Sequence, residues 1–189
     1  MNQRMNQVWR ALMRTSFMDG PSFVNDSTKR VGGLLQHCIK FWMYLEDITA
    51  TQNLEWKNPD SPFIIAMLHR VYEIDAYYWE DYYKVWEDKD HRHYASDVFQ
   101  LIDDLGIELN EEERACIAYY NINFRDKSIL EQYPNARWME FETCCLCGRH
   151  ITKGFENNPS PVAEDGVCCG YCNLNKVIPA RLQKRLKED

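Results

Sequence analysis

The C-terminal part of the chain contains the segment CCLCGRHITKGFENNPSPVAEDGVCCGYC, which spans residues 144–172. Six of the eight cysteines lie in this segment. They include two C-x-x-C pairs, Cys144 with Cys147 and Cys169 with Cys172, separated by 21 residues. A tight C-x-x-C turn places two thiolates on one ion, and tetrahedral Zn²⁺ takes four such ligands at about 2.3 Å. The spacing therefore predicts one Zn²⁺ bound by four cysteines.

Two further cysteines leave one position of this ligand set open. Cys145 and Cys168 are additional thiols, and Cys168 could replace Cys169 as the third ligand. His150 is a substitute ligand by residue type, but it lies outside the C-x-x-C pairs. Four thiolates fill the coordination shell of zinc and leave no place for water, so the predicted zinc is structural. Buried free thiols without a metal are the alternative, which the spacing disfavours.

Length and composition indicate a folded protein of one domain, or of one domain with a small appended unit. Of the 189 residues, 45% are hydrophobic and 13% are aromatic, which argues against disorder. The net charge of −7 argues against nucleic-acid binding through bulk charge. No apolar run reaches the roughly 20 residues that span a membrane, and the N-terminal residues lack an apolar signal core. Cysteines used as metal ligands are typical of a reducing compartment, so we expect a cytoplasmic protein without a membrane partner.

The chain before the cysteine segment has the periodicity and the capping residues of a mainly α protein. Ser61-Pro62 is typical of a helix start, Gly106 of a helix end, and Asn110 with Glu113 of a capping box. These features predict a helical domain over residues 1–138 and a zinc unit over residues 139–189. We expect helices over residues 6–18, 34–45, 61–74, 94–105, 110–120, 128–132 and 173–187.

Two stretches of the helical part carry a family resemblance. Residues 31–45 read VGGLLQHCIKFWMYL, and residues 63–70 read FIIAMLHR. They resemble the ligand helices of HD-domain metal-dependent phosphohydrolases, above all the small HD proteins that bacteriophages encode. The resemblance covers about residues 6–125, and some of these phage proteins also end in a zinc-knuckle segment. The helix expected over residues 173–187 is the usual ending of a treble-clef-type zinc unit. The resemblance implies an HD-like helical bundle in which His37 and His69 stand at metal-ligand positions.

The sequence departs from the HD pattern at two ligand positions. Arg70 follows His69 where the family has its aspartate, and Tyr120 stands near the position of the last histidine. A cation beside a divalent metal repels it, and two imidazoles with an arginine do not make a hydrolytic centre. The HD pocket formed by His37, His69 and Arg70 is therefore predicted to be degenerate, as in a pseudoenzyme. The alternatives are hydrogen-bonded core histidines, and an Arg70 that binds a phosphate or carboxylate or pairs with an acid.

The leading hypothesis is a non-catalytic zinc-binding protein, encoded by a phage, that binds a host or viral macromolecule. A patch rich in Tyr and Trp supports a protein partner, because these residues dominate protein interfaces. The patch lies within residues 77–86 and consists of Tyr77, Tyr78, Trp79, Tyr82, Tyr83 and Trp86. The isolated cysteines Cys38 and Cys116 are expected in the core.

Two other functions remain open. The first is an active metal-dependent phosphohydrolase on nucleotides, which would need His91 or His93 together with Asp75 or Asp103 to complete the site. The second is a nucleic-acid-binding zinc module. Residues 169–176 resemble the second zinc-binding pair of HNH nucleases, but residues 151–167 contain no histidine for catalysis. The basic residues that could contact nucleic acid are Lys176, Arg181, Lys184, Arg185 and Lys187.

Overall fold

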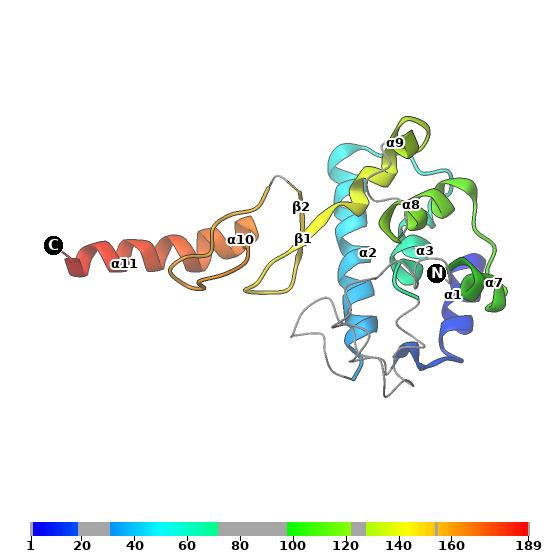
Figure 1. The fold of residues 1–189 in the computed structure, drawn as a ribbon, viewed down its shortest axis with the longest axis horizontal. Coiled ribbons are helices and arrows are strands. Elements are labelled where there is room, and N and C mark those ends of the chain that lie inside the picture. Colours follow the sequence, from blue (N-terminus) through cyan, green and yellow to red (C-terminus); the bar gives the residue numbers. More distant parts are fainter. Residues whose placement is uncertain (1, 19–30, 72–97, 122–127, 154, 189) are drawn as a thin grey trace. The chain divides into compact units, whose positions relative to one another are not determined.

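The computed structural model describes residues 2–18, 31–71, 98–121, 128–153 and 155–188 (Figure 1). The protein is mainly α and consists of two compact units, Met1–Met139 and Glu140–Asp189. The first unit is helical, and the second contains the cysteine segment. Among the described residues, no helix is both long and apolar enough to cross a membrane.

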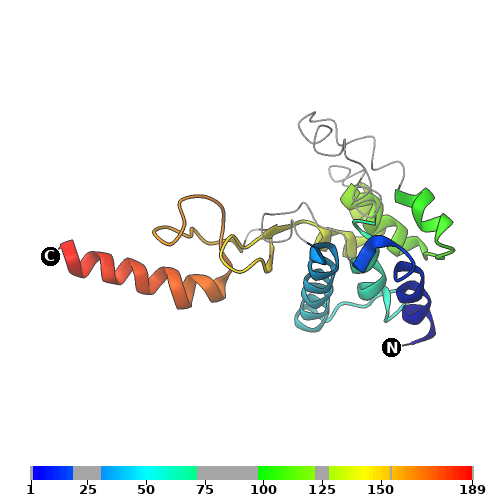
Figure 2. The same cartoon turned by 90° about the horizontal axis from the view of Figure 1, so that it is seen from below.

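The helical unit is built from α-helices and two short 3₁₀ segments (Figures 1 and 2). In chain order the described elements are α1 (Gln3–Leu12), η1 (Ser16–Met18), α2 (Gly33–Gln52), α3 (Ser61–Leu68), α7 (Val98–Asp104), α8 (Glu111–Asn121), α9 (Ser128–Gln132) and η2 (Pro134–Met139).

The short helix α3 lies at the centre of the helical unit. Its sequence SPFIIAML is apolar on almost every side, and all eight residues are buried. A helix that is hydrophobic all round is stable only when other elements enclose it. Helices α1, α2 and α8 pack on α3, and α7 contributes Ile102 to the same core as Val8, Leu12, Leu34 and Ile117. The two residues that follow α3, His69 and Arg70, are therefore also held inside the unit.

Local signals explain where several helices begin and end. Gly32 precedes α2 with φ = +73°, a conformation that glycine adopts without steric cost. At the start of α8 the Glu113 backbone N–H donates to Asn110 Oδ1, and the Asn110 N–H donates to Glu113 Oε2, each at 2.9 Å. These bonds confirm the capping box that the sequence predicts. Helix α9 has the predicted bounds.

Other boundaries differ from the sequence prediction. The first helix begins before Asn6, because the Asn2 side chain accepts a hydrogen bond from the Met5 N–H. It also ends before Met18: the Thr15 hydroxyl donates to the Leu12 carbonyl at 2.6 Å, and a 3₁₀ turn follows. The predicted 61–74 helix ends at Leu68, with a turn over residues 69–71. Its remainder lies outside the described residues.

A buried ionic cluster joins three elements of the helical unit. Arg4 on α1 forms a two-pronged ion pair with Glu113 on α8, and the Glu113 side chain is fully buried. The Ser61 hydroxyl at the start of α3 donates to the same carboxylate at 2.7 Å. Because this carboxylate also closes the capping box of α8, Glu113 holds the starts of α3 and α8 and helix α1 together.

The C-terminal unit combines a small antiparallel sheet with a helix. Strands β1 (Phe141–Thr143) and β2 (His150–Thr152) pair with Phe141 opposite Thr152. After the loop, a continuous helical segment runs from Gly170 to Glu188 through α10 (Gly170–Cys172), the π-helical η3 (Asn173–Val177) and α11 (Ile178–Glu188). It is called the terminal helix below, and it begins before the predicted residue 173.

Candidate metal centre

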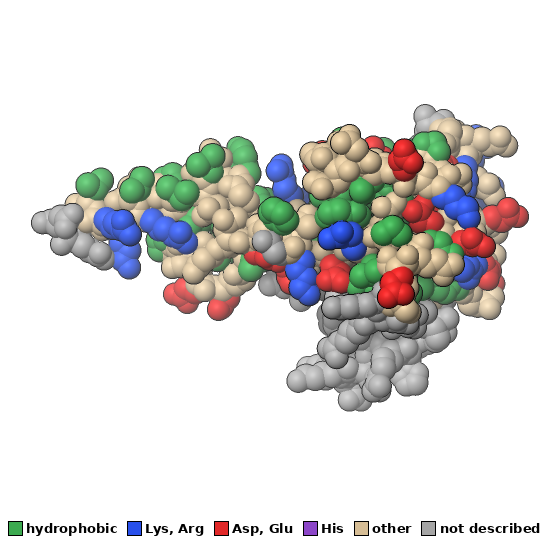
Figure 3. All heavy atoms as spheres, turned by 90° about the horizontal axis from the view of Figure 1, so that it is seen from above, with side chains coloured by type: hydrophobic (Ala, Val, Ile, Leu, Met, Phe, Trp, Pro, Cys, Tyr) green, Lys and Arg blue, Asp and Glu red, His purple; other side chains and the backbone are tan. Residues whose placement is uncertain are grey.

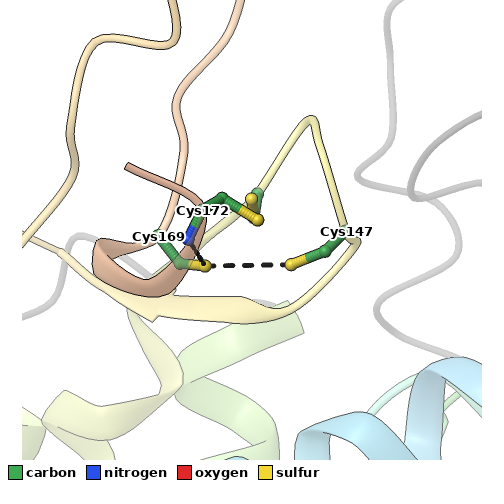
Figure 4. A group of neighbouring side chains, drawn as sticks. Cys147, Cys169 and Cys172 are labelled. Carbon is green, nitrogen blue, oxygen red and sulfur yellow. Dashed lines mark hydrogen bonds between the residues drawn. The ribbon is translucent and has the colours of Figure 1, made fainter. Parts of the chain in front are cut away.

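The C-terminal unit brings four cysteines together. The Sγ atoms of Cys144, Cys147, Cys169 and Cys172 all lie within 4.8 Å of one another. Figure 4 shows the thiols of its three labelled cysteines pointing toward a common centre. The Cys147 and Cys169 sulfurs are 3.8 Å apart. In a tetrahedral zinc site with Zn–S bonds of about 2.3 Å, two sulfurs are about 3.8 Å apart, so the cluster fits this ion.

The first cysteine pair lies in a closed turn after β1. The Cys144 N–H donates to the Arg149 carbonyl, and the Gly148 N–H donates to the Cys144 carbonyl, each at 2.8 Å. Gly148 has φ = +69°, which lets the chain reverse within the turn. The turn therefore places Cys144 and Cys147 on the same side of the chain.

The second cysteine pair spans the first turn of the terminal helix. Cys169 is the residue that caps this helix, and its Sγ accepts from the Cys172 N–H at 3.5 Å. Residues three apart in a helical turn lie on one face, so both thiols point toward the first pair.

The loop between the two pairs is tied to the second pair and to the terminal helix. Asn157 and Cys168 exchange two backbone hydrogen bonds, and the Asn173 side chain donates to Asn157 Oδ1 at 3.0 Å. Arg181 on α11 donates to the carbonyls of Asn158 and Ser160. Sequence reasoning missed this role of the loop. The polar Asn157-Asn158 pair, directly before a proline, was the available signal.

The structure answers which of the neighbouring cysteines belongs to the cluster. Cys169 is part of it, whereas Cys168 is buried in the small core of the C-terminal unit with Ile151 and Val177. Consecutive residues of an extended chain point to opposite sides, so only one of the two can face the other thiols. Cys145 is exposed. His150 is outside the cluster, and its buried ring packs edge-on against Phe141 at 4.4 Å.

Two thiols of the cluster, Cys144 and Cys172, differ in how readily they ionise. Burial opposes ionisation of Cys144, but hydrogen bonds from the Cys169 and Leu146 backbone and the Cys147 thiol lower its pKa to about 7. Burial and hydrogen bonds with Cys147 and Cys169 raise the pKa of Cys172 well above its usual range. Thiolates this close repel one another, so all four ionise together only when a cation offsets their charge.

A pair of histidines lies inside the helical unit. His37 on α2 and His69 after α3 are both buried, and their Nε2 atoms are 3.0 Å apart. His69 Nδ1 lies 2.8 Å from the Ala66 carbonyl, which can only accept, so Nδ1 carries a proton. In neutral His69 the Nε2 atom is then the acceptor, and His37 Nε2–H is the donor.

Arg70 and Tyr120 complete the surroundings of this histidine pair. The Arg70 Nη1 donates to the Tyr120 hydroxyl at 2.7 Å, and the Tyr120 ring meets His69 edge-on at 5.0 Å. The Phe41 ring lies 4.5 Å from the His69 ring on another side. The positions that the resemblance singled out therefore do meet in space, in an aromatic and cationic environment.

Other predicted site residues are not brought together. Asp103 is exposed and lies 3.6 Å from Arg114, and it is not part of a metal-ligand cluster. Within the described ranges, the four cysteines are the one group of three or more side chains suited to a metal. Asp75, His91, His93 and the aromatic patch of residues 77–86 lie outside the described residues. The predicted core cysteines Cys38 and Cys116 are fully buried.

Comparison with known proteins finds no matching family model, no similar curated protein and no similar solved structure. The description of this protein therefore rests on its geometry alone. It is a mainly helical protein with a C-terminal four-cysteine cluster able to bind a metal.

Proposed function

We propose that this protein is a non-catalytic zinc protein that acts by binding a macromolecule. One Zn²⁺ is held by Cys144, Cys147, Cys169 and Cys172 and stabilises the C-terminal unit. The helical unit is a degenerate HD-like bundle that engages a host or viral partner. The observation that supports the zinc site in this proposal is the mutual approach of the four sulfurs to within 4.8 Å.

The chemistry of the donors supports a structural role for the ion. Four thiolates satisfy the tetrahedral shell of zinc and leave no coordination position for a substrate or a water molecule. Two of the ligands open the terminal helix, and two lie in the turn after β1. An ion at this point would join two chain segments that share a small core. Binding of such an ion contributes directly to the folding free energy of the unit.

The surroundings of the histidine pair support a helical unit without hydrolytic activity. A catalytic divalent ion needs open positions and carboxylate or imidazole ligands that leave room for water. Here the neighbours of His69 are the Phe41 and Tyr120 rings, and the guanidinium of Arg70 is bonded to the Tyr120 hydroxyl. A fixed positive charge near a metal site lowers its affinity for a cation.

One distance favours a second function, a metal-dependent phosphohydrolase acting on nucleotides. Two nitrogens that bind one octahedral ion at about 2.1 Å are about 3.0 Å apart when they occupy adjacent positions. The Nε2 atoms of His37 and His69 have this separation. The hydrogen bond deduced above accounts for it equally well, and it needs no third ligand.

Two assays on the purified full chain test the proposal. Zinc content per chain is measured for Cys169→Ser and, as the matched control, for the neighbouring Cys168→Ser. We expect zinc to be lost in the first variant and retained in the second. Nucleotide hydrolysis is measured with Mn²⁺ or Mg²⁺ for the unmodified chain and for His69→Ala. Hydrolysis that disappears in His69→Ala would replace the proposal with the phosphohydrolase function.

A further inference from the structure

The terminal helix carries an exposed apolar stripe. Leu174, Ile178, Leu182 and Leu186 follow one another at intervals of four residues, and their exposed fractions range from 37% to 78%. In Figure 3 hydrophobic side chains form a row along this helix, with Lys and Arg side chains beside them. Large apolar side chains aligned on a protein surface are typical of an interaction site.

The stripe points away from the body of the C-terminal unit. Val177 is fully buried in the small core, and Arg181, one turn later, is bonded to the loop carbonyls of Asn158 and Ser160. Ile178 and Leu182 each follow one of these residues and are therefore rotated by about 100° around the helix axis. The zinc unit itself does not cover the stripe.

The charges of the chain are distributed unevenly. Residues 173–187 contain five Lys and Arg and no Asp or Glu. Residues 1–139 contain 15 Lys and Arg against 22 Asp and Glu, a net charge of −7. The terminal helix would attract an anionic surface, and the helical unit of a second copy, with its net charge of −7, is such a surface.

Helix α2 presents a matching exposed face. Ile39 and Met43 are exposed apolar residues, 38% and 60% respectively, and the exposed acids Glu46 and Asp47 follow them. Met43 follows Ile39 by four positions, and Glu46 and Asp47 follow Met43 by three and four positions, so these residues lie on one side of the helix. This face is apolar in its first half and acidic in its second half.

We propose that the terminal helix of one copy packs on α2 of a second copy, and that two such contacts close a symmetric dimer. In both helices two apolar residues four positions apart are followed, three residues later, by a charge. The charges are opposite, Arg185 in the terminal helix and Glu46 in α2. If the two helices pack in parallel, the apolar side chains of one lie beside the apolar side chains of the other. The same register places the two opposite charges beside each other. This self-association goes beyond the proposed function and does not depend on it.

The first test is the mass of the zinc-loaded full chain in solution. Sedimentation velocity over about a hundredfold range of protein concentration is expected to give a species of twice the 22.5 kDa chain mass. The double variant Leu182→Glu/Leu186→Glu and the variant Met43→Glu should each raise the dissociation constant at least about tenfold. Val162→Glu is the matched control, because Val162 is a 41% exposed apolar residue that belongs to neither helix, and it should leave the dissociation constant unchanged.

The second test is a charge exchange. Arg185→Glu and Glu46→Arg should each weaken the dimer by about two- to fivefold, and the variant that carries both changes should recover it. Zinc content and the circular dichroism spectrum are measured for every variant, because all substituted side chains are exposed and the fold should be retained.

Several results would overturn the proposal. A chain that remains monomeric at every concentration would do so. A dimer that Leu182→Glu/Leu186→Glu leaves intact would place the contact elsewhere. A dimer that Met43→Glu leaves intact would exclude α2, and failure of the combined charge exchange to restore association would exclude the parallel pairing.

Discussion

The Nε2 atoms of His37 and His69 lie 3.0 Å apart inside the helical unit, although the two histidines are 32 positions apart in the chain. His37 faces inward from α2, and His69 is the residue at which α3 ends. The same pair could serve as part of a metal site or as a hydrogen-bonded link between two helices. The Arg70 and Tyr120 side chains near the pair favour the hydrogen-bonded link.

If the pair is a structural link, His37→Ala should lower the free energy of unfolding by about 1–3 kcal/mol, because it leaves His69 Nε2 without its donor and opens a small cavity. Urea unfolding measures this change. Gln52→Ala, at the exposed end of the same helix, is the control and should change stability by less than about 0.5 kcal/mol. Equal stability of His37→Ala and Gln52→Ala would contradict the assignment.

The ionic cluster around Glu113 gives a second prediction. Glu113→Gln should destabilise the helical unit by about 2–4 kcal/mol, because it removes the charge that Arg4 pairs with and weakens the cap of α8. Glu111→Gln is the matched control on the same helical turn. Its ion pair with Lys57 is exposed at both ends, so a change below about 0.5 kcal/mol is expected. Thermal unfolding compares the stability of the two variants. Equal losses of stability would show that burial of the Glu113 ion pair does not contribute to stability.

The backbone conformation at position 32 requires a glycine. At φ = +73° an alanine is strained, and its Cβ would lie 3.5 Å from the Met18 carbonyl oxygen. Gly32→Ala should therefore cost about 1–2 kcal/mol of stability. Gly170→Ala is the control, because a Cβ there meets open space. Denaturant midpoints measure the stability of both variants. A Gly32→Ala midpoint at or above that of Gly170→Ala would show that the positive φ at position 32 does not require a glycine.

Removal of the metal should affect the two compact units differently. A chelator that competes for zinc is expected to unfold residues 140–189 and leave residues 1–139 folded, because the four-cysteine cluster lies wholly in the second unit. Limited proteolysis with trypsin and mass spectrometry would then report new cleavage in residues 140–189 alone.

Cys172→Ser should reproduce this cleavage pattern without chelator. Cys145→Ser, which changes an exposed cysteine outside the cluster, should not. An unchanged pattern in both Cys172→Ser and the chelated protein would mean that the C-terminal unit is stable without a metal.

Features encoded by short stretches were predictable from the sequence. The spacing of the C-x-x-C pairs indicated the four-cysteine cluster, and Asn110 with Glu113 indicated the start of α8. Spacing could not decide between Cys168 and Cys169, because that choice depends on the direction of each side chain. The end of the first helix was missed because a side-chain bond from Thr15 closes it.

Features that join distant parts of the chain were not predictable in the same way. Arg4 and Glu113 are 109 residues apart, and neither belongs to a motif that would pair them. The resemblance to HD proteins singled out His37, His69, Arg70 and Tyr120, which do lie together. What these residues do there depends on ring contacts and hydrogen bonds, which a sequence pattern does not contain.

The measurement that tests the central claim most directly is metal content per chain, by elemental analysis of protein purified without chelator and again after soaking in Mn²⁺ or Mg²⁺. We predict one zinc per chain, retained in His37→Ala, and no further metal. A second metal that binds the unmodified chain and is lost in His37→Ala would contradict the account, because the histidine pair would then be a working metal site.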